Sequence, residues 1–263
     1  MSQRNRRDYS AGTMKMDIRK GYDRNFGKWF ASDVLRAVSG YGLIEQGEKV
    51  CVALSGGRDS VALLYILWYL NAYSNLRFDL SAVHIKTDRY DTSLLADYCA
   101  DLGVHYIEEG LDLKEETPDK SICSVCSRLR RGAISRILEK EGTRKIAYGH
   151  HADDVAETFF MNIVHNRRLG SFSPRVEYAD NPMIVIRPMI YLDAKRIERI
   201  HRHAGLPVLS YVCPYEKDNL RQVFTKAMPG LDELFHTRGF SRILVDALEN
   251  IDKTNVWEDL RVG

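Results

Sequence analysis

The sequence has no long hydrophobic run. In 263 residues, no apolar stretch approaches the roughly 18 residues that a membrane span needs. The opening Met-Ser-Gln-Arg-Asn-Arg-Arg lacks the apolar core of a signal peptide. These two absences predict a cytoplasmic protein with no membrane partner. Hydrophobic residues make up 44% of the chain and charged residues 28%, which favours a folded domain with a sizeable core.

Cysteine is scarce, with five residues in the chain. In a reducing compartment such residues are more often ligands, catalysts or core side chains than disulfides. Cys51 falls in a strand pattern and Cys99 in a helix pattern, so we predict that both are core residues. Cys123, Cys126 and Cys213 fall in polar stretches that we expect to be loops. These three are the candidates for chemistry.

Neither charge sign dominates, because the net charge is only +2. Any affinity for nucleic acid must therefore come from local patches. Residues 1–30 hold eight Lys/Arg against three Asp/Glu, and five aromatic residues are interleaved with them. This composition fits either a solvated arm or a basic and aromatic surface that contacts RNA.

Apolar runs that favour strands alternate with helical patterns. The expected strands are 49–54, 78–86, 104–107, 143–148 and 183–187, and the expected helices are 25–39, 61–70, 94–102 and 127–140. This alternation predicts an α/β fold with a doubly wound, mostly parallel sheet.

The chain divides into three parts on composition and pattern. We expect a basic N-terminal arm over 1–24, a catalytic domain over 25–215 and a C-terminal helical extension over 216–263. Gly, Ser and Pro gather over 169–182, which predicts a loop there.

The most informative stretch is Leu54-Ser55-Gly56-Gly57-Arg58-Asp59-Ser60, between an expected strand and an expected helix. In a parallel sheet such a turn lies at the carboxyl edge, where ligands bind. Two glycines let the backbone approach an anion, the first helical N–H groups point at it, and two hydroxyls and a cation add donors. The stretch predicts a phosphate site, although a tight capped turn would use similar residues. It is not a Walker A loop, because no Gly-x-x-x-x-Gly-Lys-Ser/Thr is present.

A second strand-to-helix turn carries Gly149-His150-His151 followed by Asp153 and Asp154. Its glycine would also permit close approach of a phosphate, and the two carboxylates could hold Mg²⁺. For Asp153 we favour the simpler role of a helix cap. For the two histidines we favour hydrogen-bonded polar roles over direct chemistry.

The cysteines are a further group of residues that could carry chemistry. Cys123 and Cys126 are three residues apart at the start of a helix pattern, so both could face one metal. A lone Cys-x-x-Cys also fits a redox pair or half of a zinc site. If Cys213 joins them, three thiolates would leave one iron of a cubane cluster open to an exogenous sulfur.

These motifs resemble a known family. Ser55-Gly-Gly-Arg-Asp-Ser60 resembles the SGGxDS PP-loop of ATP pyrophosphatases. Cys123 to Gly132 and Tyr148 to Thr158 resemble the TtcA/TtuA family of tRNA 2-thiolation enzymes, and the order of motifs matches over about residues 25–255. The thiocytidine branch is the most similar, because the chain lacks the zinc-binding cysteines typical of the thiouridine branch.

Two positions depart from the resembled pattern. Arg58 stands where members usually carry Lys, which keeps the charge on a bulkier, forked group. Ser210 stands where the thiocytidine branch usually has the first cysteine of a second Cys-x-x-Cys. The three expected cluster ligands are unaffected.

The resemblance implies a PP-loop/HUP-like fold, a [4Fe-4S] cluster, ATP and Mg²⁺. It implies catalytic roles for Asp59, Arg130, Asp154 and the cluster ligands Cys123, Cys126 and Cys213. The residues that it places against the nucleotide are Ala53, Leu54, Ser55, Gly56, Gly57, Asp59, Ser60, Ile85, Arg130, Gly149 and Asp154. It further implies tRNA and a sulfur donor, sulfide or a persulfide carrier, as partners, and a homodimer.

The implied reaction is adenylation of a pyrimidine C2 oxygen in tRNA, followed by sulfur transfer that forms 2-thiocytidine. Four alternatives stay open on the sequence. They are 2-thiouridine formation, removal of sulfur from a thiolated base, another PP-loop ATP pyrophosphatase reaction, and a non-catalytic zinc- and RNA-binding protein.

Overall fold

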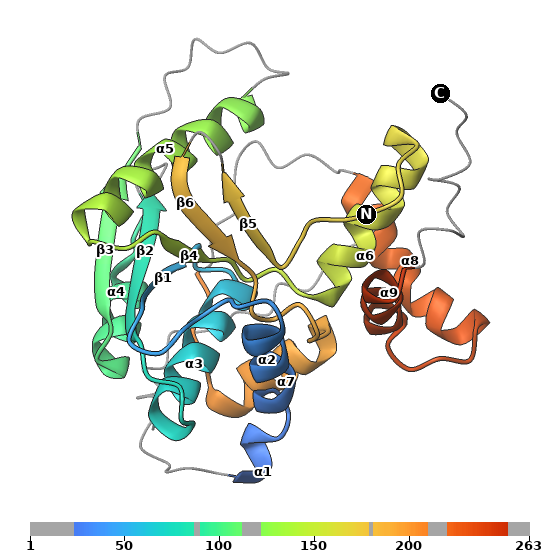
Figure 1. Ribbon diagram of the computed structural model, residues 1–263, viewed down its shortest axis with the longest axis horizontal. Coiled ribbons are helices and arrows are strands. Elements are labelled where there is room, and N and C mark those ends of the chain that lie inside the picture. The colour runs from blue at the N-terminus through green and yellow to red at the C-terminus, as the bar shows by residue number, and fades with distance from the viewer. Residues whose placement is uncertain (1–23, 87–89, 112–121, 179–180, 210–219, 252–263) are drawn as a thin grey trace, which may run out of the picture.

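The computed structural model describes residues 24–86, 90–111, 122–178, 181–209 and 220–251. Their strands form one six-stranded sheet in the order β3-β2-β1-β4-β6-β5 (Figure 1). The strands are β1 (Lys49–Ala53), β2 (Asp79–Lys86), β3 (His105–Gly110), β4 (Lys145–Ala147), β5 (Arg175–Tyr178) and β6 (Asn181–Ile186). All neighbouring pairs are parallel except β5 with β6. The predicted mostly parallel sheet is confirmed.

Helices cover both faces of this sheet. They are α1 (Arg24–Gly27), α2 (Ala31–Gly40), α3 (Arg58–Tyr73), α4 (Ser93–Leu102), α5 (Ile122–Lys140), α6 (Ala152–Met161), α7 (Ala194–Ala204), α8 (Leu220–Leu234) and α9 (Phe240–Glu249), with a π-helix η1 (Asn162–Asn166) after α6. Among the described helices, none is long and apolar enough to cross a membrane.

Alternating side chains of the strands build two apolar cores. Val50 and Val52 of β1 and Leu54, which follows it, belong to the larger cluster, which α2, α3, α4 and α7 complete. Cys51 points to the other face, where Ile134 and Ile137 of α5 cover it. The period of two that defines a strand thus assigns successive residues to opposite layers.

Cys51 and Cys99 are core residues, as predicted. Both are fully buried and free of disulfides. Burial raises the pKa of each thiol to about 12, so both stay protonated and unreactive at neutral pH.

Two expectations about local structure were wrong. The expected loop over 169–182 contains β5, which closes the edge of the sheet antiparallel to β6. The expected helix over 25–39 is two helices, because a turn interrupts it after Gly27. At that turn the Gly27 backbone lies so close to Tyr69 that a Cβ would be 2.7 Å from the phenol oxygen. Phe26 and Phe30 are nevertheless both buried, as the pattern required.

The chain reverses direction across the sheet at β1. From β1 it passes through α3 to β2 and then β3 on one side, and α5 returns it to β4 on the other side of β1. The turns that follow β1 and β4 are therefore neighbours at the carboxyl edge, which is where ligands bind in such sheets. These turns hold the two glycine-containing motifs of the sequence.

Gly149, after β4, is the closest point between these turns. A Cβ built on it would lie 2.9 Å from the Asp59 carbonyl carbon and 3.0 Å from the Ser60 amide nitrogen. Real Cβ atoms do not approach backbone so closely, so only glycine lets the β4–α6 turn reach the start of α3.

We therefore expect Gly149→Ala to lower the free energy of unfolding by about 1–3 kcal/mol, because the start of α3 must move to admit the methyl group. Gly110→Ala is the matched control, since Gly110 also ends a parallel strand but a Cβ there meets nothing within 4 Å. Urea unfolding of both variants checks this. Equal stabilities would contradict the proposed close contact.

Candidate functional site

The loop between β1 and α3 is held in shape by its own hydroxyl groups. The Ser60 hydroxyl accepts from the Ser55 amide at 3.1 Å and donates to the Gly57 carbonyl at 3.0 Å, and the two serine oxygens are 3.0 Å apart. Gly57 is the N-cap of α3 and makes no side-chain cap hydrogen bond. The loop thus presents the N-terminus of a 16-residue helix without a capping side chain over it, which suits an anion.

Gly56 brings a distant segment onto this loop. Its φ of +85° is in the region that favours glycine, and its carbonyl accepts from the Leu209 amide at 2.9 Å. A Cβ on Gly56 would lie 2.4 Å from the Leu209 side chain. The glycine therefore serves both the backbone turn and the close approach of the chain that follows α7.

His151 is the centre of a buried charge cluster that the sequence did not reveal. Its side chain is 8% exposed, and three carboxylates surround the ring. The ring nitrogens lie 3.4 Å from Asp153, 3.4 Å from Asp154 and 3.9 Å from Asp59. Burial alone would lower the pKa of His151, but the three carboxylates raise it to about 9. The ring is therefore a cation at neutral pH.

The carboxylates of this cluster also hold backbone. Asp154 accepts from the amide of His151, the N-cap of α6, at 3.0 Å. Asp153 accepts from the Ala194 amide at the start of α7 at 2.7 Å, so it stabilises the N-terminus of α7 rather than capping its own helix as expected. Together with His151 these contacts lower the pKa of Asp153 against the effect of burial.

Asp59 has an oxygen that remains available. Its Oδ1 is buried and accepts no hydrogen bond from the described residues, and the nearest cation, the Arg58 Nε, is 3.6 Å away. Among the described residues, no three His, Cys, Asp or Glu side chains are arranged to hold a metal ion by themselves. The pair Asp153 and Asp154, predicted to hold Mg²⁺, stays a prediction, because an ion held by two carboxylates completes its shell with water and phosphates.

His84 links the loop to Tyr90. The His84 Nδ1 lies 2.7 Å from the Leu54 carbonyl and its Nε2 lies 2.9 Å from the Tyr90 hydroxyl. Because a carbonyl can only accept, Nδ1 carries the proton and Nε2 accepts from Tyr90. Burial lowers the pKa of His84, and the charge of Arg130 on α5 lowers it further. Arg130, for which the resemblance implied a catalytic role, lies on α5 near enough for its charge to influence His84.

Arg187 is a further site residue that sequence reasoning did not single out by itself. It follows β6, it is 9% exposed, and its Nε donates to the His150 Nδ1 at 3.3 Å. Its Nη1 donates to the Ser173 carbonyl at 2.6 Å, and its guanidinium lies 4.6 Å above the Phe172 ring. Burial lowers the pKa of Arg187. The signal in the sequence was its place directly after a strand, before Pro188.

Other residues that the resemblance places against a nucleotide also lie at this end of the strands. Ala53 ends β1 and Leu54 is 1% exposed, with its amide donating to Val83 of the neighbouring strand at 2.8 Å. Ile85 lies near the end of β2, with its side chain in the core beneath α5. Its backbone, rather than its side chain, is what it offers to a ligand.

Cys123 and Cys126 lie within α5 rather than in a loop before it. The helix begins at Ile122, so the two residues occupy its first turns, three positions apart. Residues i and i+3 share a helix face, so the backbone places both on one side of α5. Cys126 is partly exposed and free of disulfides. Cys213 lies outside the described residues.

The described part of the chain that precedes Cys213 nevertheless contacts the loop between β1 and α3. Leu209, hydrogen-bonded to Gly56, is the last described residue before it. The end of α5 precedes β4, so α5 runs antiparallel to the strands and begins on the carboxyl side of the sheet. The two approaches to the cysteines are therefore both at the edge that holds the phosphate loop.

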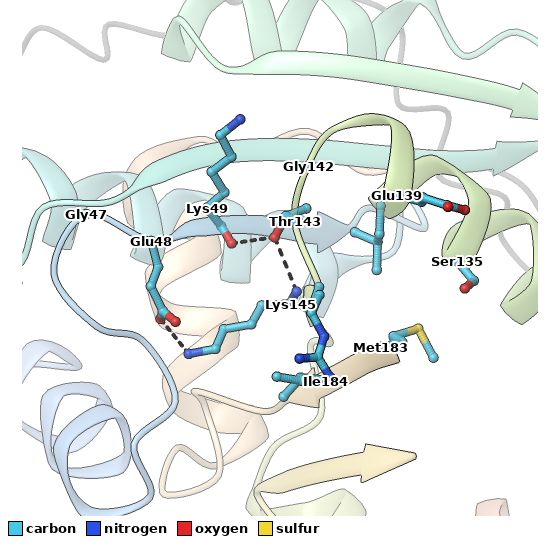
Figure 2. Close-up of a pocket in the computed structure, with 12 residues that line it drawn as sticks. Gly47, Glu48, Lys49, Ser135, Glu139, Gly142, Thr143, Lys145, Met183 and Ile184 are labelled. Atoms are coloured by element: carbon cyan, nitrogen blue, oxygen red, sulfur yellow. Dashed lines mark hydrogen bonds and ion pairs between the residues drawn. The ribbon is translucent and has the colours of Figure 1, made fainter. Parts of the chain in front are cut away.

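A hollow of about 910 Å³ lies at the opposite, amino edge. Glu48, Lys49, Thr143, Lys145 and Met183 are among its lining residues (Figure 2). The buried Lys145 ammonium is paired with Glu48 at 2.5 Å, and the Thr143 hydroxyl bridges the Lys49 carbonyl and the Lys145 amide. The polar groups that line this hollow thus hold the starts of β1 and β4 together. None of the lining residues belongs to the candidate site.

The charge of His151 predicts a pH dependence of stability. Its pKa rises from 6.5 unfolded to about 9 folded, so the stabilisation is complete below pH 6.5 and is lost as the pH rises through 9. At 1.36 kcal/mol per unit, the loss amounts to about 3 kcal/mol. Urea unfolding between pH 6 and 10, with EDTA and without nucleotide, measures it.

The fall in stability should be absent in His151→Gln and present in His236→Asn, because His236 is exposed and outside the cluster. His236 has a φ of 54°, which asparagine tolerates, so this control does not strain the backbone. If His151→Gln showed the same pH profile as the unmodified chain, the buried imidazolium would not exist.

The site can now be set beside known proteins. Residues 26–211 match the family model of the PP-loop domain. A tRNA-cytidine(32) 2-sulfurtransferase of Haemophilus ducreyi is 35% identical over 234 residues, covering 86% of this chain and 73% of that protein. One from a Polaromonas species is 35% identical over 246 residues, covering 91% and 79%.

A solved structure shares the fold. The U34-tRNA thiolase NcsA from Methanococcus maripaludis, determined with its [4Fe-4S] cluster, has a TM-score of 0.68 at 21% identity, covering 88% of this chain and 83% of that one. The match of the family model over most of the chain, with the identity to relatives over most of their length, settles the membership. The chain belongs to the PP-loop family and, within it, to the family of the tRNA-cytidine(32) 2-sulfurtransferases.

Proposed function

We propose that this protein is an ATP-dependent tRNA sulfurtransferase that converts a cytidine to 2-thiocytidine. One observation carries the proposal. The two glycine-containing turns meet at the carboxyl edge of the sheet, and they bring together the N-terminus of α3, Arg58 and the Asp59 carboxylate. The names of the relatives, tRNA-cytidine(32) 2-sulfurtransferases, supply the substrate. The expected place of action is the cytoplasm.

The first step activates the base with ATP. The C2 oxygen of the cytidine bonds to the α-phosphorus as the α–β phosphoanhydride breaks, and pyrophosphate leaves. The N-terminus of α3 binds the phosphates through its N–H groups and dipole, and Arg58 adds a forked cation. The charge of Arg130 offsets that of the departing pyrophosphate. The oxygen of the base becomes part of AMP, which is a good leaving group.

Mg²⁺ would enter with the nucleotide. This ion is usually held by one or two carboxylates together with substrate phosphates and water. The buried Asp59 Oδ1, which accepts no hydrogen bond from the described residues, fits the role of one carboxylate ligand, and Asp154 is the second candidate. His151 lies beside both carboxylates, 3.9 Å from Asp59 and 3.4 Å from Asp154.

Cys123, Cys126 and Cys213 would hold a [4Fe-4S] cluster. The two cysteines on one side of the first turns of α5 fit such a group, because two neighbouring irons need thiolates at short range. Four residues of chain extend at most about 14 Å, so Cys213 is within reach of the phosphate loop from Leu209. With three protein ligands, the cluster would supply an iron that is open to an exogenous sulfur.

The second step replaces AMP with sulfur. Sulfide bonds to C2, and the C2–oxygen bond breaks to release AMP. Where a persulfide carrier is the donor, a thiol must first reduce its S–S bond so that the outer sulfur leaves as sulfide. No electrons are gained or lost by the base, because sulfur takes the place of oxygen at the same oxidation level. The role of this chain's residues here is to exclude water, which would regenerate cytidine.

We expect Cys123→Ser and Cys126→Ser to lose bound iron and tRNA thiolation, because serine is a poor ligand for a cluster. Anaerobic purification, iron and sulfide counting, and mass spectrometry of tRNA nucleosides with sulfide as donor measure both losses. Cys99→Ala is the control, since Cys99 is buried in α4 and should keep iron and activity. Full thiolation by Cys123→Ser would refute the proposal.

Asp59→Asn should separate the two steps. The variant should keep its iron, because Asp59 is not a cluster ligand, and should form AMP and pyrophosphate at least tenfold more slowly, because the metal-facing carboxylate is lost. Thermal melting serves as the control for folding, since Asp59 also faces His151. Unchanged tRNA-dependent AMP release would assign the nucleotide to another place.

A further inference from the structure

A helical arm rises from the site and returns to it. We call residues 152–174 the α6–η1 arm. Its first helix begins at Ala152, directly after the charge cluster, and η1 extends it to Asn166. The chain then turns and comes back to Phe172, whose ring lies 5.1 Å from the His150 ring and beneath the Arg187 guanidinium. In Figure 1 the arm extends away from the sheet, beside α8 and α9.

The tip of the arm, residues 162–169, has a defined conformation. The Asn162 carbonyl accepts from the Arg168 amide at 3.1 Å, and its side chain donates to the Gly170 carbonyl at 2.9 Å and accepts from Asn166 at 2.9 Å. Arg167 has a φ of +52°, which an arginine adopts only where neighbouring contacts impose it. A π-helix that ends in such a residue is uncommon in a purely structural helix end and recurs at functional sites.

The tip exposes cations and apolar side chains together. His165, Arg167 and Arg168 are exposed and form no ion pair with another described residue. No acidic residue occurs from 162 to 176 in the sequence. Val164 is 59% exposed and Leu169 60%. Apolar side chains at these exposures are costly in water unless they meet a partner.

Several exposed cations elsewhere on the described chain are engaged. Arg199 lies 3.6 Å above the Trp29 ring and Arg202 pairs with Glu198 on α7. On α5, Arg136 pairs with Glu109. The tip therefore offers charge that is free to meet an anion, at the end of an arm whose base is in the site.

We infer that the tip of the α6–η1 arm binds the single-stranded loop of the tRNA that carries the target base. Arg167 and Arg168 contact backbone phosphates of this loop, and Val164 and Leu169 contact an unstacked base beside these phosphates. This inference rests on the proposed function and adds where the substrate docks.

The chemistry of the tip selects a loop rather than a duplex. A duplex offers phosphates and 2′-hydroxyls but stacks its bases away from apolar side chains, whereas a loop offers both phosphates and base faces. The ten residues of α6 span about 15 Å, which equals about four stacked nucleotides at roughly 3.4 Å each. A loop held at the tip can thus place a nearby nucleotide at the phosphate site.

The test removes the charges without disturbing the backbone. Arg167→Asn/Arg168→Gln keeps a residue that tolerates positive φ at 167. We expect it to bind an unmodified tRNA transcript roughly tenfold more weakly and to reduce the slope of log affinity against log salt by about 1.4–1.8. Lys140→Gln/Arg144→Gln removes the same charge at the amino edge and should bind like the unmodified chain. Fluorescence anisotropy at several salt concentrations measures both.

A second pair of substitutions tests the apolar contact and the rival occupant. Val164→Thr/Leu169→Asn should weaken binding of the tRNA but not of a duplex RNA of equal charge. Sedimentation of each variant reports its oligomeric state. If either variant changed the oligomeric state while each protomer still bound tRNA normally, the tip would contact a second copy of the chain, and the inference would fail.

The inference and the proposed function fail in different ways. Wild-type affinity and salt slope in Arg167→Asn/Arg168→Gln would overturn docking at the tip and leave thiolation intact. Absence of tRNA binding by the unmodified protein would overturn both. ATP binding and thermal melting without tRNA should be unchanged in all three double variants, because none of these side chains contacts the charge cluster.

Discussion

The site depends on the contact between the turn after β4 and the first turn of α3. At Gly149 two backbones meet at a distance that excludes any side chain. That contact exists because the sheet reverses its winding between β1 and β4, which places two helix N-termini side by side. The first residues of α3 and α6 carry the hydrogen-bond donors and the carboxylates of the two motifs. The close approach of the two backbones therefore brings these groups together in one site. A shift of one turn would separate Asp59 from His151.

The buried imidazolium is what makes this proximity tolerable. Asp59, Asp153 and Asp154 gather at two helix starts, where the helix dipoles favour them but their mutual repulsion does not. One buried cation in contact with all three offsets that repulsion. Arg187 then fixes the neighbouring His150 from the other side. The polar groups of the edge are thus arranged before any ligand arrives, which is how an enzyme avoids reorganising its site during the reaction.

The sequence predicted the fold well where patterns were long and local. The strand runs near 49–54 and 78–86 and the phosphate loop between β1 and α3 are found as expected. It failed where long-range contacts decide structure. β5 pairs only with β6, so Gly, Ser and Pro around it concealed an edge strand that local preference does not favour. At the turn after Gly27, the chain packs against Tyr69, which lies far along the sequence.

The same limit applies to the site. The residues of the loop between β1 and α3 could be assigned from the sequence, because the groups that they contact are close by in the sequence. The Ser55–Ser60 contact is an example. His151 and Arg187 could not be assigned, because the partners that charge or orient them come from other elements. The stretch around Cys123 and Cys126 was predicted to be a loop because its residues are polar, but it is helical. α5 already begins at Ile122, before the apolar residues of the helix pattern.

Gly56 shows why one small residue can carry several constraints at once. Its positive φ shapes the turn that presents α3 to an anion, its carbonyl fixes Leu209, and its missing side chain leaves room for the leucine. A movement of the loop on binding phosphates would therefore move the segment that continues toward Cys213. Leu209 is tied to this loop by a backbone hydrogen bond, and not by a replaceable side chain. The same geometry explains why a bulkier Arg58 can be accommodated beside the loop, since it points outward and leaves the Gly56–Leu209 contact untouched.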